Sequence, residues 1–146
     1  MKKLFAFVLG LLALIATTAN AQVYTVNTLT LTNTVAGSTT ITPNVAIPLA
    51  GRYDQLSLQA TFVLASAGTS GVNFTVQRSL DNTNWETVPY QTLTVTGAGT
   101  TSVTGILDFT YGAAGYLRLG TIVNSNSVAV NSLVIKTATK PRPYNK

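Results

Sequence analysis

The 146-residue chain contains no cysteine and no histidine. Without a thiol or an imidazole it cannot build the Ser-His-Asp or Cys-His arrangements of nucleophilic catalysis. Zinc sites made of His and Cys ligands are excluded for the same reason. No disulfide can form, so an exported form of the chain has to rely on its hydrophobic core or on self-association for stability.

Charged side chains are also scarce: they make up 9% of the residues and include only four acids. General acid–base chemistry would have to use two of these four carboxylates. Asp81 and Glu86 flank one predicted turn, but a polar surface loop does not raise a carboxyl pKa as a general acid requires. No glycine-rich segment has the spacing of a phosphate-binding loop. We therefore predict that the protein is not an enzyme.

Long hydrophobic runs are limited to one, at residues 4–16, which is short for a helix that crosses a bilayer. It follows two lysines and precedes the small-residue pattern Ala19-Asn20-Ala21. This order is typical of a secretory signal peptide, which we expect to form a helix within residues 1–21 and to be cleaved before Gln22. A membrane anchor is the alternative, and no stable membrane span is expected after cleavage. The sequence thus predicts export to the periplasm, the cell surface or the extracellular space.

Basic residues gather in the C-terminal segment 136–146, whereas the body, residues 22–135, holds three arginines and four acids. The prolines of the segment favour extended chain, and we expect a solubilising tail. Contact with an acidic partner or a membrane surface is the alternative. Nucleic-acid binding is not expected, because the nearly neutral body has no basic stripe and no recognisable binding motif.

Apolar and polar residues alternate along the body, and turn-forming clusters interrupt the pattern. The clearest predicted strand is 55–65, whose apolar face holds Leu56, Leu58, Ala60, Phe62 and Leu64. Further strands are predicted at 29–32, 72–80, 85–96, 102–111, 116–123 and 128–136. This pattern favours a single all-β domain over residues 22–135, an antiparallel β-sandwich of about eight strands with immunoglobulin-like or jelly-roll topology. A closed barrel is the alternative.

The segment 79–88, Ser-Leu-Asp-Asn-Thr-Asn-Trp-Glu-Thr-Val, holds the only tryptophan and two of the four acids. Its possible oxygen ligands for calcium are Asp81, Asn82, Asn84 and Glu86. Their spacing departs from the EF-hand pattern, and Asp and Asn in turns often bond to the local backbone. We therefore predict a hairpin with its turn at residues 81–84, a return strand from Trp85 and a solvent-facing Glu86. Calcium is the alternative, and no other cofactor is expected.

Trp85 has two interpretations. Tryptophan is highly buried on average, so Trp85 is expected to cover the end of the core. Alternatively, an exposed Trp85 forms a stacking platform for a sugar ring together with Tyr90 or Tyr116. Arg118 is expected to face solvent or to pair across strands with Asp108.

The hairpin segment, SLDNTNW, resembles the S-L-D-G-x-x-W hairpin of small β-sandwich proteins encoded among bacteriophage virion genes and of bacterial surface modules. Three other segments resemble the same group in the same order: YDQLSLQATF, GYLRLG and SVAVNSLVIK. The resemblance covers roughly residues 52–135. It implies a non-enzymatic structural or adhesive role, as in head decoration, fibres or tail accessories. Virion proteins usually lack an export signal, so a phage origin and a bacterial origin both stay open.

Two functions from different classes follow. The first is an exported structural protein that assembles with itself or with a structural partner, or decorates a virion or a cell envelope. Low charge favours this hypothesis, because charges on edge strands usually prevent sheets from associating. The second is a module that binds surface glycans through Trp85, Tyr90 and Tyr116.

Overall fold

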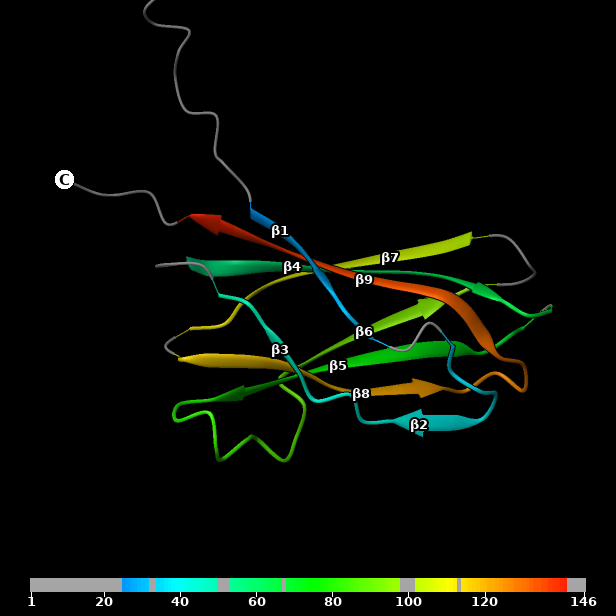
Figure 1. Ribbon diagram of the computed structural model, residues 1–146, viewed down its shortest axis with the longest axis horizontal. Coiled ribbons are helices and arrows are strands. Elements are labelled where there is room, and N and C mark those ends of the chain that lie inside the picture. Colours follow the sequence, from blue (N-terminus) through cyan, green and yellow to red (C-terminus); the bar gives the residue numbers. More distant parts are fainter. Residues whose placement is uncertain are drawn as a thin grey trace, which may run out of the picture.

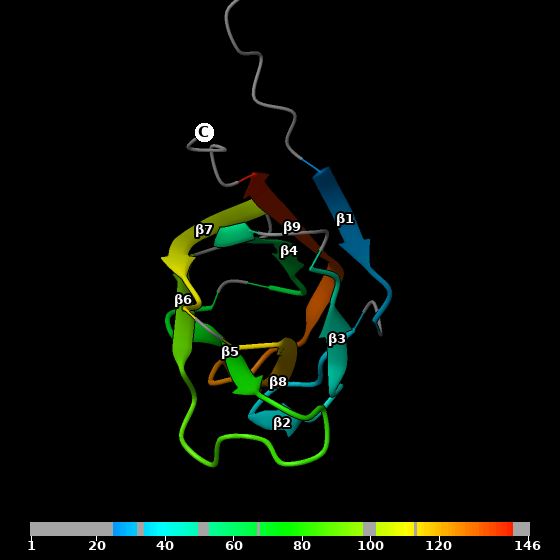
Figure 2. The ribbon, with the colours of Figure 1, turned by 90° about the vertical axis from the view of Figure 1, so that its left-hand side faces the viewer.

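A computed structural model describes residues 25–31, 34–49, 53–66, 68–97, 102–112 and 114–141. The predicted signal peptide and its helix, at residues 1–21, lie outside these ranges, as does the last part of the expected tail, 142–146. The described chain is all-β, and its two antiparallel sheets face each other as a sandwich (Figures 1 and 2). No helix of this described part is long and apolar enough to cross a membrane.

One layer, sheet A, has the strand order β1-β9-β4-β7. Its strands are β1 (Thr25–Leu29), β9 (Val130–Pro141), β4 (Tyr53–Leu64) and β7 (Ser102–Thr110). The other layer, sheet B, has the order β2-β8-β5-β6, with β3 also paired to β8. Its strands are β2 (Thr39–Ile41), β3 (Val45–Ile47), β8 (Tyr116–Asn124), β5 (Gly71–Ser79) and β6 (Gln91–Thr96).

The connections between the strands mostly cross from one sheet to the other. The exceptions are the short step from β2 to β3, which follow each other along one edge of β8, and the hairpin from β5 to β6. This hairpin, residues 80–90, projects from one end of the sandwich (Figure 1). The fold therefore presents the segment with the only tryptophan at an end of the molecule.

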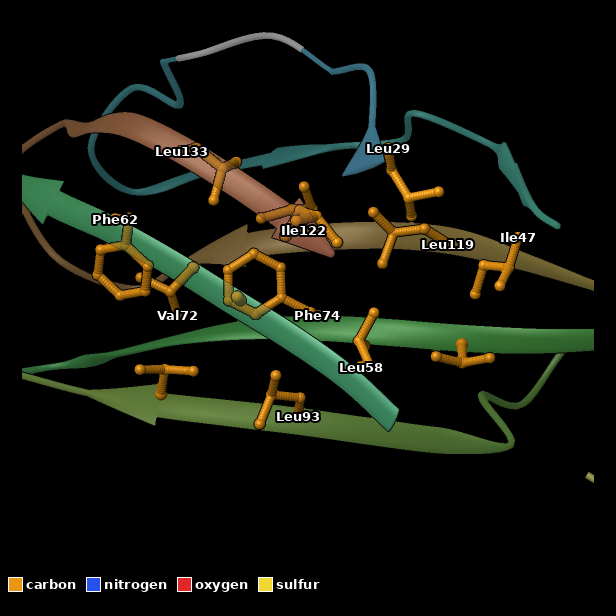
Figure 3. Packing of buried hydrophobic residues seen from close by; sticks show 14 of the residues in the cluster. Leu29, Ile47, Leu58, Phe62, Val72, Phe74, Leu93, Leu119, Ile122 and Leu133 are labelled. Carbon is orange, nitrogen blue, oxygen red and sulfur yellow. The ribbon is translucent and has the colours of Figure 1, made fainter. Parts of the chain in front are cut away.

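The core lies between the two sheets. The predicted apolar face of β4 is confirmed, because each of its five residues is at most 1% exposed: Leu56, Leu58, Ala60, Phe62 and Leu64. Phe62 packs against Phe74 of β5 with ring centroids 6.2 Å apart (Figure 3). Truncating a buried aromatic side chain typically costs about 3–5 kcal/mol. Packing between the inward-facing apolar side chains therefore holds the two sheets together.

A bulge interrupts the pairing of β5 with β8. The register shifts between Phe74 and Val76, so that Thr75 lies opposite both Gly120 and Thr121. The hydroxyl of Thr75 accepts a hydrogen bond from the backbone N–H of Thr121 at 2.7 Å. A bulge bends the strand that carries it. On the other edge of β8, β2 and β3 accordingly form two short strands in place of one.

Three predicted boundaries are wrong. The strand expected at 29–32 lies earlier, as β1, and the strand expected from Trp85 begins only at Gln91. The segment 136–146, expected to be a tail, begins inside β9, which continues to Pro141. Proline is tolerated at the end of the strand because it only lacks a donor there. Pairing of β9 with both β1 and β4 extends it beyond the apolar pattern.

Candidate functional site

Asp81 orders the hairpin between β5 and β6. Its Oδ1 accepts hydrogen bonds from the backbone N–H groups of Thr83 at 2.9 Å and Asn84 at 2.8 Å. Its Oδ2 accepts from Nδ2 of Asn84 at 2.7 Å, and the hydroxyl of Ser79 donates to Oδ1 at 3.0 Å. Asn82 takes a left-handed conformation with φ of 61°, which asparagine tolerates. The local bonding expected for Asp81 is confirmed.

These hydrogen bonds hold the pKa of Asp81 well below its ordinary value of 3.8. The backbone N–H of Asn84 is the largest cause, followed by that of Thr83 and by the side chains of Asn84 and Ser79. Hydrogen bonds donated to a carboxylate favour its charged form. Asp81 is therefore ionised at neutral pH and is poorly suited to act as a general acid.

Glu86 pairs with Arg78, which corrects the expectation that it simply faces solvent. Its Oε1 lies 2.6 Å from Nη2 and 3.0 Å from Nε of Arg78. The Arg78 hydrogen bond lowers the pKa of Glu86, and the same bond raises the pKa of Arg78. The two side chains are 31% and 36% exposed, so the pair contributes no more than about 1 kcal/mol. Oε2 of Glu86 is buried and has no partner in the described structure.

The four proposed calcium ligands do not converge on one point. Asp81 and Asn84 are hydrogen-bonded to each other, but both carboxylate oxygens of Asp81 accept bonds within the turn. Asn82 lies in the left-handed turn position, and Glu86 is directed to Arg78. Across the described ranges, no group of three or more His, Cys, Asp or Glu side chains is arranged to hold a metal ion. Calcium binding here would require the turn to open.

Trp85 lies in the loop, half-buried, and not in the core cluster, which corrects its predicted position. The guanidinium carbon of Arg118 lies 4.4 Å from the centroid of its ring. Nε of Arg118 donates to Oε1 of Gln77 at 2.8 Å, while Nε2 of Gln77 donates to the carbonyl of Glu86 at 2.9 Å. Gln77 of β5 is thus bonded both to the hairpin and to Arg118 of β8.

Arg118 does not pair with Asp108, contrary to the alternative expected from the sequence. Asp108 lies on β7 of the other sheet, where its carboxylate accepts a hydrogen bond from the hydroxyl of Ser57. Arg118 lies on β8 and contacts Gln77 and Trp85. The two residues belong to different layers of the sandwich, so no strand pairing brings them together.

The two tyrosines of the predicted sugar platform have different surroundings. The guanidinium carbon of Arg78 lies 3.6 Å from the centroid of the Tyr90 ring, and Phe109 meets that ring edge-on at 6.1 Å. The hydroxyl of Tyr90 donates to the carbonyl of Thr110 at 2.6 Å, so this side chain closes one end of the sandwich. Tyr116 is 44% exposed. The face of Tyr90 toward Arg78 is therefore occupied, whereas Tyr116 is accessible.

A hollow of about 480 Å³ lies beside the hairpin. Its lining includes Arg78, Ser79, Leu80, Asp81, Asn84 and Glu86. Leu80 and Val88 project into solvent from the hairpin, 79% and 77% exposed. The hairpin thus combines a rigid polar turn, an ion pair and two exposed aliphatic side chains.

Sequence reasoning missed a buried pair, Asn124 and Asn126, at the opposite end of the sandwich. Nδ2 of Asn124 donates to the carbonyls of Val128 at 2.9 Å and Ala36 at 3.0 Å. Oδ1 of Asn126 accepts from the backbone N–H of Ser70 at 2.8 Å. The two side chains, 1% and 2% exposed, join three connections. The only signal in the sequence is a pair of asparagines in a segment that reads as an ordinary turn.

The outer face of sheet A is formed by the sides of its strands that point away from the core between the two sheets (Figure 2). Its central rows follow the strand register and hold Ser57, Gln59, Thr61, Thr104, Ile106, Asp108, Val134, Lys136 and Ala138. Two of these described side chains carry charge, one of each sign. Val26 and Ile106 are each 61% exposed on this sheet, and Val134 is 39% exposed.

The chain matches no protein-family model and no curated protein sequence.

Proposed function

We propose that the chain is a non-catalytic exported structural or interaction protein. Its β-sandwich assembles with itself, or decorates a larger surface such as a virion or a cell envelope. The observation that carries this proposal is the outer face of sheet A, whose described central rows combine exposed aliphatic side chains with one lysine and one aspartate. The resemblance of the hairpin segment to phage and bacterial surface proteins agrees with it, and so does the signal-like sequence at residues 1–21.

Physical chemistry supports association through this sheet. Burying an unpaired charge in a contact between two protein surfaces costs much free energy, so a sheet face with few charges associates more readily. Lys136 is the one cation among the described side chains of the central rows, and the carboxylate of Asp108 accepts a hydrogen bond from Ser57. Ser, Thr and Gln side chains are desolvated at lower cost than charges are. Burial of the exposed side chains of Val26, Ile106 and Val134 in a contact lowers the free energy, because it removes apolar surface from water.

The strand order supports a finer description of the fold. We infer that the sandwich is a jelly roll, because sheet A joins β1, β9, β4 and β7 while sheet B joins β2 and β3, β8, β5 and β6. Nearly every consecutive pair of strands lies in opposite sheets, as two interlocked Greek keys require. Jelly rolls occur in viral capsid domains and in lectins, so this topology fits both of the functions considered. The choice between these two functions therefore has to be argued from the candidate site and not from the fold.

The test of self-assembly is the molar mass of the mature chain, measured by static light scattering over a range of concentrations. We expect the mean mass to rise with concentration. A clean monomer at high concentration would count heavily against the proposal. The double variant Ile106→Lys, Val134→Lys places charge on the proposed face and should shift the rise to higher concentration. Its matched control is Leu80→Lys, Val88→Lys, which adds the same charge at the hairpin.

A second candidate function, glycan binding, is favoured by the surroundings of Trp85. The ring of Trp85 is held by Arg118, and Tyr116 lies two residues from Arg118 on the same strand. A ring held by a cation and an exposed ring on the strand of that cation suit stacking against a sugar, and the lining of the hollow beside the hairpin includes hydrogen-bonding side chains such as Asn84. Tyr90 has no place in this platform, because Arg78 and Phe109 both contact its ring and its hydroxyl is bonded to the carbonyl of Thr110.

A glycan array tests this candidate. Binding that is lost in Trp85→Ala and Tyr116→Ala, with the fold retained, would support it. Thr94→Ala on the outer side of β6 is the control that should leave binding unchanged. An array without any signal for the parent chain would remove the candidate.

A further inference from the structure

A hollow of about 490 Å³ opens on the outer face of sheet A, across β9, β4 and β7. Its lining residues at outward positions are Gln55, Ser57, Asp108, Thr110 and Ala138. Asp108 is the one acid among them, and the hydroxyl of Ser57 donates a hydrogen bond to its Oδ1. A carboxylate can accept several hydrogen bonds, and those from cations are the strongest. The hollow therefore suits a cationic side chain.

A cation stands on the same face, one row of the sheet away. Lys136 and Ile106 lie in one row, joined by their pairing with Gln59 of β4, and Ala138 and Asp108 lie in the next row. These four outward positions are the corners of a rectangle of about 10 Å by 7 Å, given the usual spacing of strands and residues. Lys136 and Asp108 occupy opposite corners. Within the described structure Lys136 enters no ion pair.

This rectangle is complementary to itself. Two copies can face each other about a two-fold axis that lies between them and runs close to the other diagonal of the rectangle. Lys136 of each copy then lies opposite Asp108 of the other. Ile106 and Ala138 lie close to the axis, so each meets its own counterpart. Ile106 is 61% exposed, and this arrangement buries its apolar side chain at the centre of the contact.

We propose that two copies of this chain dock through the outer faces of sheet A, with Lys136 of each copy inserted into the hollow beside Asp108 of the other. The partner is a second copy, because one face presents both the cation and the acid that receives it, at positions that a two-fold axis exchanges. Such a contact uses the same patch on both copies and closes on two of them. This inference rests on the self-assembly proposed above and names the contact that carries it.

The size of the face fits a dimer that forms reversibly. β9 and β4 have 12 residues each and β7 has 9, with β1 beside β9. Four strands about 4.8 Å apart and about 30 Å long give a projected face of roughly 570 Å². Two such faces bury roughly 1,100 Å², near the lower end of specific protein interfaces. We therefore expect the assembly to depend on concentration, and the charge pairs to fix how the copies are oriented.

Exchange of the two charges tests the contact. Lys136→Asp places two acids opposite each other, and Asp108→Lys places two lysines opposite each other. For each variant alone, the concentration at which half of the chain is assembled should rise at least about tenfold. In an equal mixture of the two variants, a mixed dimer again sets every acid against a lysine. Native mass spectrometry, which separates the three dimers by mass, should show the mixed dimer as the main species, and the double variant should assemble like the parent.

Matched variants control for net charge. Thr92→Asp, Thr94→Asp and Thr92→Lys, Thr94→Lys change the charge by the same amounts on the outer side of sheet B. They should assemble like the parent, and their mixed dimer should reach only the statistical share of about one half. Lys140 is paired with Gln55, further along β9. Lys140→Asp mixed with Asp108→Lys should give no mixed dimer. A mixed dimer in this mixture, and none with Lys136→Asp, would assign the contact to Lys140 and overturn the inference.

The remaining outcomes separate this contact from the proposed function. A parent chain that stays monomeric at high concentration in light scattering would refute both. A parent that assembles, while Lys136→Asp and Asp108→Lys assemble equally well alone, would refute the contact and leave self-assembly intact. The same holds if the two variants stay apart when mixed. Circular dichroism checks the fold of each variant, and Lys136→Glu with Asp108→Arg repeats the experiment if one of them does not fold.

Discussion

The side chain of Gln77 passes directly over Gly120, so that a Cβ atom at position 120 would lie 2.8 Å from Oε1 of Gln77. From this position Gln77 bonds to Arg118 and to the carbonyl of Glu86. The missing side chain at the bulge of β8 therefore allows one glutamine to connect β5, β8 and the hairpin. This arrangement explains why the hairpin lies in a defined place although, of residues 80–90, only Tyr90 packs against the core.

We expect Gly120→Ala to destabilise the protein by about 1–3 kcal/mol, because the new methyl group forces Gln77 out of its position. Chemical denaturation measures the change. The matched control is Gly115→Ala, whose Cβ would meet its nearest atom, the carbonyl oxygen of Leu80, at an ordinary 3.4 Å. In a Gln77→Ala background the cost of Gly120→Ala should shrink. An unchanged cost in that background would show that Gln77 is not the cause.

Arg118→Ala should expose the ring of Trp85 and reduce stability by about 0.5–1 kcal/mol, the range of a surface cation–π contact. Trp85 is the only tryptophan, so its fluorescence reports on this site alone. We expect acrylamide to quench the emission more strongly in the variant than in the parent. Lys136→Ala, on the other sheet, serves as the control. Equal quenching in Arg118→Ala and the parent would contradict the contact.

Acid should weaken the hairpin through Asp81. Its folded pKa is depressed, so its contribution to stability is present above the ordinary value of 3.8 and is lost as the pH falls toward the folded pKa. We expect the melting temperature of Asp81→Asn to fall less than that of the parent when the pH is lowered from about 5 to 2. Protonation of Glu86 lowers the melting temperature further in both proteins. Asn84→Ala removes one donor to Asp81 and keeps the backbone donors, so its fall in melting temperature should lie between those of the parent and Asp81→Asn. Parallel curves for the parent and Asp81→Asn would rule out this role.

Asn124→Ala should cost about 3 kcal/mol or more, because it leaves several buried backbone carbonyls without their donor. The carbonyls concerned belong to Val35, Ala36 and Val128. Urea denaturation followed by circular dichroism measures the loss. Ser125→Ala, at the exposed neighbouring position, should change stability by no more than about 0.5 kcal/mol. A loss of that small size for Asn124→Ala would mean that water replaces the amide.

The prediction of the fold succeeded where the pattern was long and regular. Residues 55–65 alternate without interruption, and β4 with its buried face follows from that alternation alone. The strand expected from Trp85 failed for the opposite reason. Backbone bonds from Glu86 and Tyr90 to β5 keep residues 80–90 in a wide hairpin, and the alternation does not report such bonds.

The candidate site was predicted only at its most local part. Asp81 caps its own turn through residues next to it in the chain, so the sequence indicates this bonding directly. The partners of Trp85 and Glu86 come from β8 and β5, and two of the three carbonyls that Asn124 binds belong to residues about ninety positions away. Contacts of this kind depend on how the strands are ordered in the sheets.

The sequence by itself determined that the described chain is all-β and which faces of its long strands are buried, because a period of two leaves one apolar face for one core. It also excluded chemistry that depends on His or Cys. The tertiary structure alone decided that Arg118 holds Trp85 and that Glu86 pairs with Arg78. The physical reason is that each of these contacts joins a residue of the hairpin to a residue of a strand, and a local pattern carries no information on which segments become neighbours.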